Sequence, residues 1–272
     1  MRNEPYLADC HTHSRVSPDA RDSMSVMAEA AFGAGLRELC VTDHVEPMEF
    51  GTDRPRTGYD WERLAAEFEE AREAWGDRLT LRLGVELGDA PWDEALCDKL
   101  LSVAPPLDFV IGSVHTLSPA MGCDLFHFTP ADETEARRGI ADYLELVRKT
   151  VLWGHFSVLG HLTLPLRYLN ENQGFSLTFD GFEAEVAEIF RLLIHRGLGI
   201  EVNTNRGGMP LPDGKWLTMY RSLGGEIVTL GSDAHCAQDV GRGIREGQAL
   251  LRACGFRRFC TFADRKPVWH EL

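Results

Sequence analysis

The sequence predicts an α/β fold in which parallel strands alternate with helices and the strands close into a barrel. Short apolar segments alternate with segments of helical period along the chain, which is typical of strand–helix units built around a parallel sheet. Histidine and carboxylate side chains follow one expected strand after another. The 272 residues show neither a low-complexity linker nor a repeat, so we expect one domain over residues 1–272.

Strands are expected where short apolar runs stand between turn-forming residues, and helices where apolar residues recur at helical spacing. The expected strands are residues 6–10, 38–42, 79–85, 108–111, 157–160, 198–202 and 226–230, with a last apolar run at 259–262. The expected helices are residues 23–33, 59–75, 92–103, 132 or 134 to about 152, 182–196, 216–223 and 240–254. Ser23 suits a helix N-cap, and Gly76 suits the end of the second helix.

Charge and cysteine usage exclude several classes of function. The 28 basic and 42 acidic residues give a net charge of −14, and such a surface repels nucleic acid and anionic membranes. Seven cysteines without CxxC spacing argue against a disulfide framework and indicate a reducing compartment. The N-terminal residues lack an apolar signal core, and no uncharged run is apolar enough to span a bilayer. We therefore expect a cytoplasmic protein with neither nucleic acid nor membrane as partner.

The position of the candidate metal ligands is the most informative feature, because they stand at the C-terminal ends of successive expected strands. In chain order they are His11 and His13, Asp43 and His44, Glu86, His115, His161, Glu201 and Asn203, and Asp233 and His235. In a closed barrel all these strand ends meet at one mouth, whereas a doubly wound sheet would spread them along an edge. The shared chemistry of seven strand ends therefore favours the barrel.

Each of these signals is weak when taken alone. A single histidine after a strand, such as His115 or His161, is more often a hydrogen-bonded core residue than a ligand. The pair His11 and His13 is stronger, because alternate residues of a strand point to the same side and suit one metal ion. Six of the ten histidines lie just beyond an expected strand, and we interpret this set as a metal centre.

The residue types suggest which metals and which reaction the centre supports. Imidazole and carboxylate ligands suit Zn, Fe and Mn, and a carboxylate can bridge two ions about 3.5–4 Å apart. Glu86 is the carboxylate on a middle strand and is the expected bridge. Water bound to such ions has a pKa near 7 and supplies hydroxide, so a protein nucleophile is unnecessary. The sequence contains neither GxSxG nor a Walker loop nor GxGxxG after a strand.

The ordered motifs resemble those of the polymerase and histidinol phosphatase (PHP) superfamily, and within it the branch of monofunctional histidinol-phosphatases. Between residue 7 and about residue 245 these motifs are His11-Thr12-His13, Thr42-Asp43-His44, Gly84-Val85-Glu86, Ile111-Gly112-Ser113-Val114-His115, Leu159-Gly160-His161-Leu162, Glu201-Val202-Asn203-Thr204 and Gly231-Ser232-Asp233-Ala234-His235. The resemblance implies a distorted seven-stranded TIM-like (β/α) barrel that holds three divalent metal ions, Zn, Fe or Mn, at its C-terminal mouth.

The resemblance also implies a role for each ligand. One ion would be held by His11, His13, Glu86 and Asp233, the second by Glu86, His115 and His161, and the third by Asp19, His44 and His235. Many relatives have histidine where this chain has Asp19. Catalytic roles are implied for Glu86, His44, His235 and Asp233. Asp43, Glu201 and Asn203 are expected to orient ligands or brace the strand ends.

The implied activity is a metal-dependent phosphomonoesterase of histidine biosynthesis. It would hydrolyse L-histidinol phosphate to L-histidinol and phosphate by attack of a hydroxide that bridges two ions. Arg167 and Arg206 resemble basic residues that family members place near the phosphoryl group, and are the expected substrate-binding residues. The cationic leaving group needs acidic or aromatic partners at the rim, for which the sequence offers Glu46, Glu49, Phe50, Asp53, Tyr59 and the loop of residues 118–128.

Three alternatives stay open. The same site could act on another small phosphate ester, such as a nucleoside monophosphate, a sugar phosphate or a small phosphodiester. An amidohydrolase-type metallohydrolase is also a barrel with HxH on its first strand, although its motif order differs. A module with a degenerate metal site would not be an enzyme. An acidic surface fits a monomer and a homodimer equally well.

Overall fold

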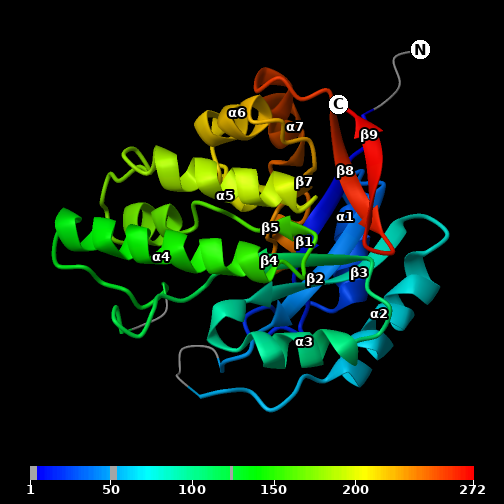
Figure 1. Ribbon diagram of the computed structural model, residues 1–272. Coiled ribbons are helices and arrows are strands. Elements are labelled where there is room, and N and C mark those ends of the chain that lie inside the picture. Colours follow the sequence, from blue (N-terminus) through cyan, green and yellow to red (C-terminus); the bar gives the residue numbers. More distant parts are fainter. Residues whose placement is uncertain (1–4, 50–53, 123–124) are drawn as a thin grey trace.

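Seven parallel strands, paired in chain order, form the central sheet of the computed structural model, which describes residues 5–49, 54–122 and 125–272 (Figure 1). They are β1 (Ala8–Thr12), β2 (Glu38–Val45), β3 (Thr80–Gly88), β4 (Phe109–Ser113), β5 (Val158–Leu159), β6 (Gly199–Asn203) and β7 (Val228–Gly231). A parallel bridge between Thr12 and Ala234 brings β1 next to the end of β7. The sheet is thus a nearly closed barrel, and the expected fold class is confirmed.

Helices follow the strands and cover the outside of the barrel (Figure 1). They are α1 (Met24–Gly33), α2 (Trp61–Trp75), α3 (Glu94–Ser102), α4 (Glu133–Trp153), α5 (Glu183–His195), α6 (Gly214–Ser222) and α7 (Ile244–Ala253). Five of the helices begin at a side chain that accepts a backbone N–H, which satisfies one of the free donors of the first turn. These N-caps are Ser23, Asp60, Asp93, Asp132 and Asp213.

Short helical turns stand at the mouth of the barrel, after the C-terminal ends of the strands. They are the 3₁₀ turns η1 (Ala90–Trp92), η3 (Asn205–Gly207) and η4 (Ala237–Asp239), and the π-helical segment η2 (Arg167–Asn172). A π-helical turn is rare and often marks a functional site. Within the described ranges, none of the helices combines the length and the apolar character that a membrane crossing requires.

A C-terminal hairpin of β8 (Arg258–Ala263) and β9 (Lys266–Glu271) closes the opposite end of the barrel. The Phe262 ring lies 5.0 Å from the Phe109 ring at the start of β4. The turn donates two backbone hydrogen bonds to Asp108, the residue before β4: Asp264 N to Oδ1 at 3.0 Å and Arg265 N to the backbone oxygen at 2.9 Å. The hairpin therefore covers the N-terminal ends of the strands.

The strand boundaries differ from the expected ones in a systematic way. β2 continues to Val45 because Asp43 and His44 still pair with β3, at Val85 and Glu86. The expected strand ends at residue 42 because polar residues follow. In the structure the side chains of Asp43 and His44 are accommodated inside the mouth of the barrel, so the strand continues. Strand β9 was not expected, because its turn at Asp264 and Arg265 has positive φ angles at non-glycine residues and Pro267 follows.

Candidate metal centre

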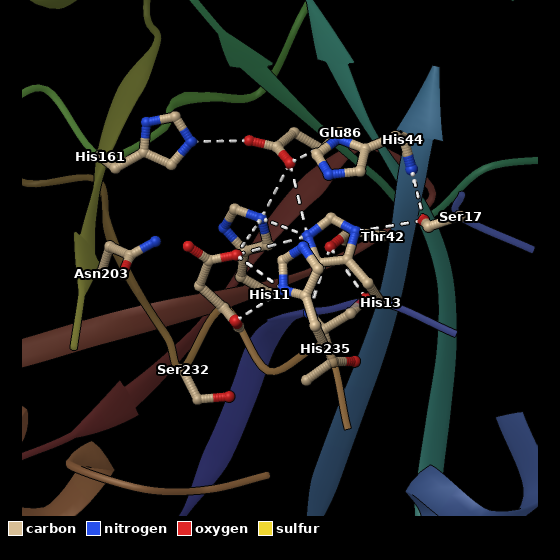
Figure 2. Close-up of polar contacts among 12 residues, drawn as sticks. His11, His13, Ser17, Thr42, His44, Glu86, His161, Asn203, Ser232 and His235 are labelled. Atoms are coloured by element: carbon tan, nitrogen blue, oxygen red, sulfur yellow. Dashed lines mark hydrogen bonds and ion pairs between the residues drawn. The ribbon is translucent and has the colours of Figure 1, made fainter. Parts of the chain in front are cut away.

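The structure brings all nine expected ligand residues together at the C-terminal mouth of the barrel. They are His11, His13, Asp19, His44, Glu86, His115, His161, Asp233 and His235. Figure 2 labels His11, His13, His44, Glu86, His161 and His235 among them. The β2–β3 register sets His44 beside Glu86, while His11 lies in β1 and His13 directly follows it. Asp19 and His235 come from the loops after β1 and β7. Residues up to 224 positions apart in the chain therefore share one cluster, which is largely buried except at Asp19 and His235.

Glu86 lies at the centre of this cluster, with a different set of imidazoles on each carboxylate oxygen (Figure 2). Its Oε1 faces His161 Nε2 at 2.7 Å and His115 Nε2 at 3.1 Å. Its Oε2 faces His44 Nδ1 at 3.1 Å, His11 Nε2 at 3.2 Å and His13 Nε2 at 3.4 Å. The carboxylate thus stands between two groups of nitrogen donors, as a bridging ligand would.

Asp233 reaches the cluster from a strained backbone. Its φ of 59° lies in the left-handed region, which a residue with a side chain adopts at a cost of about 1–3 kcal/mol. Its N–H donates to the backbone oxygen of His11 at 2.8 Å, which fixes the turn against β1. Its Oδ1 then lies 3.5 Å from His13 Nε2 and 3.7 Å from His11 Nε2.

Asp19 forms the outer edge of the centre. Its Oδ2 lies 3.1 Å from His235 Nε2 and 3.5 Å from His44 Nε2, and its side chain is 41% exposed. Burial alone would raise the pKa of Asp19, but hydrogen bonds from His235 and His44 outweigh it and lower the pKa strongly. Asp19 is therefore a charged carboxylate that opens to solvent, whereas Glu86 is enclosed.

The spacing of the imidazoles fits a divalent metal ion. His11 Nε2 lies 3.0 Å from His13 Nε2, and His115 Nε2 lies 3.4 Å from His161 Nε2. Two nitrogens bound to one tetrahedral ion at about 2.0–2.1 Å stand about 3.3 Å apart. Imidazole and carboxylate donors suit Zn, Fe and Mn. The donor set and its spacing therefore match a divalent-metal centre.

Strong electrostatic coupling accompanies this geometry. Burial opposes a charge on Glu86, but the attraction of His11, His115 and His44 outweighs it and holds the pKa of Glu86 well below its usual value. Burial likewise opposes protonation of His44, yet Glu86 and Asp19 raise the pKa of His44 to about 10. In His13, burial and the neighbouring imidazoles together lower the pKa. Protons on some of the imidazoles thus balance the carboxylates, and a cation would replace them.

Side chains behind the ligands hold them in place. Glu201 Oε1 lies 2.6 Å from His11 Nδ1, and its Oε2 accepts from the backbone N–H of His161 at 2.9 Å. Asn203 Nδ2 donates to Glu201 Oε2 at 3.4 Å. Asp43 accepts from the hydroxyl of Ser17, which lies 3.3 Å from His13 Nδ1. Asp43, Glu201 and Asn203 therefore lie where residues that orient ligands are expected.

Some supporting residues were missed by the sequence analysis. Asp9 accepts from the backbone N–H and the hydroxyl of Ser232, which directly precedes Asp233. Ser113 Oγ donates to Glu86 Oε1 at 2.6 Å. Asp89 Oδ1 accepts from the backbone N–H of His115 at 2.9 Å. Asp9 could have been found from strand alternation, because it stands two residues before His11, whereas Asp89 depends on a turn that the sequence does not reveal.

The two expected substrate arginines have different surroundings. Arg167, at the start of η2, is buried, and its Nη2 donates to Asp233 Oδ2 at 2.8 Å and to Asn203 Oδ1 at 3.3 Å. Arg206 in η3 is half-buried, and its backbone N–H donates to Ser232 at 3.0 Å. Arg167 thus contacts the candidate ligand Asp233, whereas Arg206 lies beside the turn that carries Asp233.

The expected rim residues are only partly at the rim. Glu46 is 6% exposed and lies inside the centre, so its expected place at the rim is wrong: the long β2 carries it inward beside His44. Glu49 is exposed and Tyr59 is half-buried. Phe50 and Asp53 lie outside the described residues, as do residues 123 and 124 of the loop 118–128. In that loop Phe126 is 56% exposed.

Comparison with known proteins places these features in context. The model of the PHP domain family matches residues 9–205. A histidinol-phosphatase of Lactococcus lactis subsp. lactis is 27% identical, with 95% of each chain covered. A probable histidinol-phosphatase of Deinococcus radiodurans is 31% identical, with 96% of this chain and 98% of the relative covered.

A solved structure has the same fold. It is the histidinol phosphate phosphatase of Lactococcus lactis subsp. lactis in complex with Zn, L-histidinol and phosphate, and it superposes with a TM-score of 0.78 at 24% identity. The superposition covers 96% of this chain and 98% of that chain.

Proposed function

Because the chain belongs to the PHP domain family, we propose that it is a metal-dependent phosphomonoesterase that hydrolyses L-histidinol phosphate to L-histidinol and phosphate. The names of its two histidinol-phosphatase relatives support this substrate. The proposed enzyme acts in the cytoplasm, in histidine biosynthesis, with residues 1–272 as one domain. Its substrate is a small phosphorylated molecule.

The observation that carries the proposal is the divided environment of Glu86. One oxygen faces His115 and His161, and the other faces His11, His13 and His44. A carboxylate with nitrogen donors on both sides is suited to join two cations about 3.5–4 Å apart. A core that needed a buried acid for stability alone would satisfy it with one or two donors rather than five.

We assign the expected ligands to three divalent ions. His11, His13, Glu86 and Asp233 would hold the first, Glu86, His115 and His161 the second, and Asp19, His44 and His235 the third. Bound ions of this kind activate water near neutral pH and neutralise phosphate oxygens. The chain's own part is to keep Glu86 and Asp233 charged, and the lowered pKa of both carboxyls supports this.

Arginine side chains would bind the phosphate group of the substrate. The Arg167 guanidinium is fixed by Asp233 and Asn203, and its buried Nε lacks a hydrogen-bond partner within the described part of the chain. An unpaired buried donor of an always charged group is costly unless an anion accepts from it. Arg206, beside the same turn, would add a second positive charge for the dianionic ester.

His44 and His235 would act at the open side of the centre, next to Asp19. Both rings contact the carboxylate of Asp19, which is partly exposed, and both lie close to His13 with ring centroids 4.2 Å away. This side is where an ester could enter with its leaving group toward solvent. The two imidazoles would therefore hold the third ion where the phosphate and the leaving oxygen arrive.

Phosphate release by the metal-loaded protein tests the proposal. The substrates are L-histidinol phosphate, a nucleoside monophosphate, a sugar phosphate and a small phosphodiester, each with zinc and with manganese. We expect the highest kcat/KM for L-histidinol phosphate and loss of phosphate release in Glu86→Ala. A clearly better substrate among the other esters would overturn the assigned substrate, and hydrolysis of a cyclic amide without phosphate release would overturn the reaction class.

A further inference from the structure

Among the acids of the expected rim set that the structure describes, Glu46 is the one buried in the centre. It stands two residues after His44, at the end of β2, and is 6% exposed. Its Oε1 lies 2.9 Å from His115 Nδ1 and 3.5 Å from His44 Nδ1. A single carboxylate oxygen therefore stands behind two of the candidate ligand histidines.

The His115 ring is held between two carboxylates. Its Nδ1 faces Glu46 at 2.9 Å, and its Nε2 faces Glu86 at 3.1 Å. A carboxylate on one ring nitrogen fixes the tautomer and the rotation of the ring, so that the other nitrogen presents its lone pair. The backbone of His115 is already fixed by Asp89, so the ring orientation is what Glu46 adds.

Gly88 at the end of β3 makes room for this carboxylate. A Cβ built at Gly88 would lie 2.1 Å from Glu46 Oε2 and 2.4 Å from Oε1, far inside van der Waals contact. The backbone of Gly88 is ordinary strand, so alanine fits its conformation. Glycine at this position therefore leaves the space that the Glu46 carboxylate occupies, whereas the backbone conformation itself does not call for glycine.

We propose that Glu46 is a positioning residue that orients His115, and with it His44, for metal binding. Gly88 leaves the space that the Glu46 carboxylate needs for this role. This inference rests on the proposed metal-dependent function, but it assigns Glu46 to the support of the metal centre and not to recognition of the cationic leaving group. Glu201 has the equivalent relation to His11, at 2.6 Å on the Nδ1 side.

Two variants test the proposal by different routes. Glu46→Gln keeps the shape of the side chain and removes its charge, and Gly88→Ala displaces the carboxylate while leaving it in the sequence. Metal dissociation constants are measured by chelator competition with zinc and with manganese. We expect each variant to bind the weakest-held ion about 10–100-fold less tightly, the usual cost of losing an outer carboxylate. The double variant should be little worse than either single one, since both act on one contact.

Kinetics on two substrates separate positioning from substrate recognition. L-histidinol phosphate has a cationic leaving group, and p-nitrophenyl phosphate does not. We expect kcat to fall by a similar factor on both at subsaturating metal, with KM little changed. A rise in KM confined to L-histidinol phosphate, with wild-type metal affinity, would overturn the proposal in favour of substrate recognition. Unchanged metal affinity and kinetics in both variants would also overturn it.

Matched controls isolate the contact. Glu29→Gln removes an exposed acid on α1, and Gly58→Ala adds a Cβ with no heavy atom within 4 Å among the described residues. Both should bind metal and turn over as the unmodified chain does. If Gly88→Ala does not fold, the near-isosteric Glu46→Gln alone decides the outcome. The metal-affinity measurement does not depend on the substrate, so it stands even if L-histidinol phosphate is not hydrolysed.

Discussion

The two ends of the barrel contrast sharply, although the same strands supply both. At the C-terminal mouth, buried histidines and carboxylates crowd around Glu86. At the N-terminal end, the strands start against β8, where Cys260 and Phe262 are buried on one side. Buried charged groups are thus concentrated at one end, and apolar burial at the other.

This contrast indicates a division of labour along each strand. The buried charges at the mouth are costly to bring together without a cation. The mouth therefore serves the chemistry of the site more than the stability of the fold. The hairpin end adds apolar burial that stabilises the fold and does not touch the candidate site. Substitutions at the two ends should therefore change different measured quantities, and four predictions test this separation from the largest expected effect to the smallest.

Glu86→Ala should have the largest effect, at the mouth. Loss of the carboxylate between two sets of imidazoles should lower kcat/KM for L-histidinol phosphate by about 10³-fold, or about 4 kcal/mol. Phosphate release and metal content by elemental analysis measure the effect. The far-UV circular dichroism should stay unchanged. Retention of both the metal and most of the activity would contradict a bridging role.

Phe262→Ala tests the opposite end. The ring is 5% exposed and packs on Phe109, so its removal should lower the free energy of unfolding by about 3 kcal/mol. Urea unfolding measures the loss. At a temperature where the variant is folded, kcat should match that of the unmodified chain. A large fall in kcat would show that the two ends are coupled after all.

Metal binding should depend on pH because protons occupy the metal-free centre. Burial opposes the charge, but Glu86 and other carboxylates raise the pKa of His44 to about 10 and the pKa of His115 well above its usual value. Ions need neutral imidazole, so these protons must leave on binding, and the affinity should fall as pH falls from 9 to 6. The expected slope is about tenfold per pH unit for each proton released, or about 1.4 kcal/mol.

Calorimetric titrations in buffers of different ionisation enthalpy measure that proton release. The stability of the metal-free fold should change in the opposite direction. A raised histidine pKa stabilises the fold below the unfolded value of about 6.5, and this contribution is lost as pH rises through the folded value. A metal affinity that does not change between pH 6 and 9 would contradict the proton competition.

His155→Ala should have the smallest effect. This histidine precedes β5 at the hairpin end, its side chain is 57% exposed, and its Nδ1 lies 2.6 Å from Asp98 Oδ1. An exposed ion pair contributes roughly 0.2–1 kcal/mol, so urea unfolding should show a loss below about 0.5 kcal/mol. Metal content and kcat should not change. A loss of bound metal would mean that histidines outside the mouth also support the centre.

Much of the candidate site could be predicted because strand ends are visible in a sequence. His11 directly follows a short apolar run, with His13 two residues later, and Glu86 and His161 follow similar runs. Once such runs pair in parallel and close into a barrel, their C-terminal ends must meet. Local pattern together with one topological rule was therefore sufficient to gather the candidate ligands other than Asp19, which only the family resemblance implied.

The place of Glu46 could not be predicted in this way. Its position after β2 fits a rim loop as well as a buried ligand support, and the choice depends on Gly88 of the neighbouring strand, which leaves space for the carboxylate. The hairpin turn at Asp264 and Arg265 was missed for a related reason. It is held by hydrogen bonds to Asp108, a residue more than 150 positions earlier in the chain.

The amino-acid sequence by itself determined the alternation of strands and helices, the chemistry of the mouth and the order in which its donors appear. The tertiary structure decided which oxygen of Glu86 each imidazole faces, which acids stand behind the histidines, and what closes the other end. A sequence pattern reports spacing and polarity along the chain. The contacts around Glu86 and behind the histidines depend instead on packing between strands that are distant in sequence and adjacent in space.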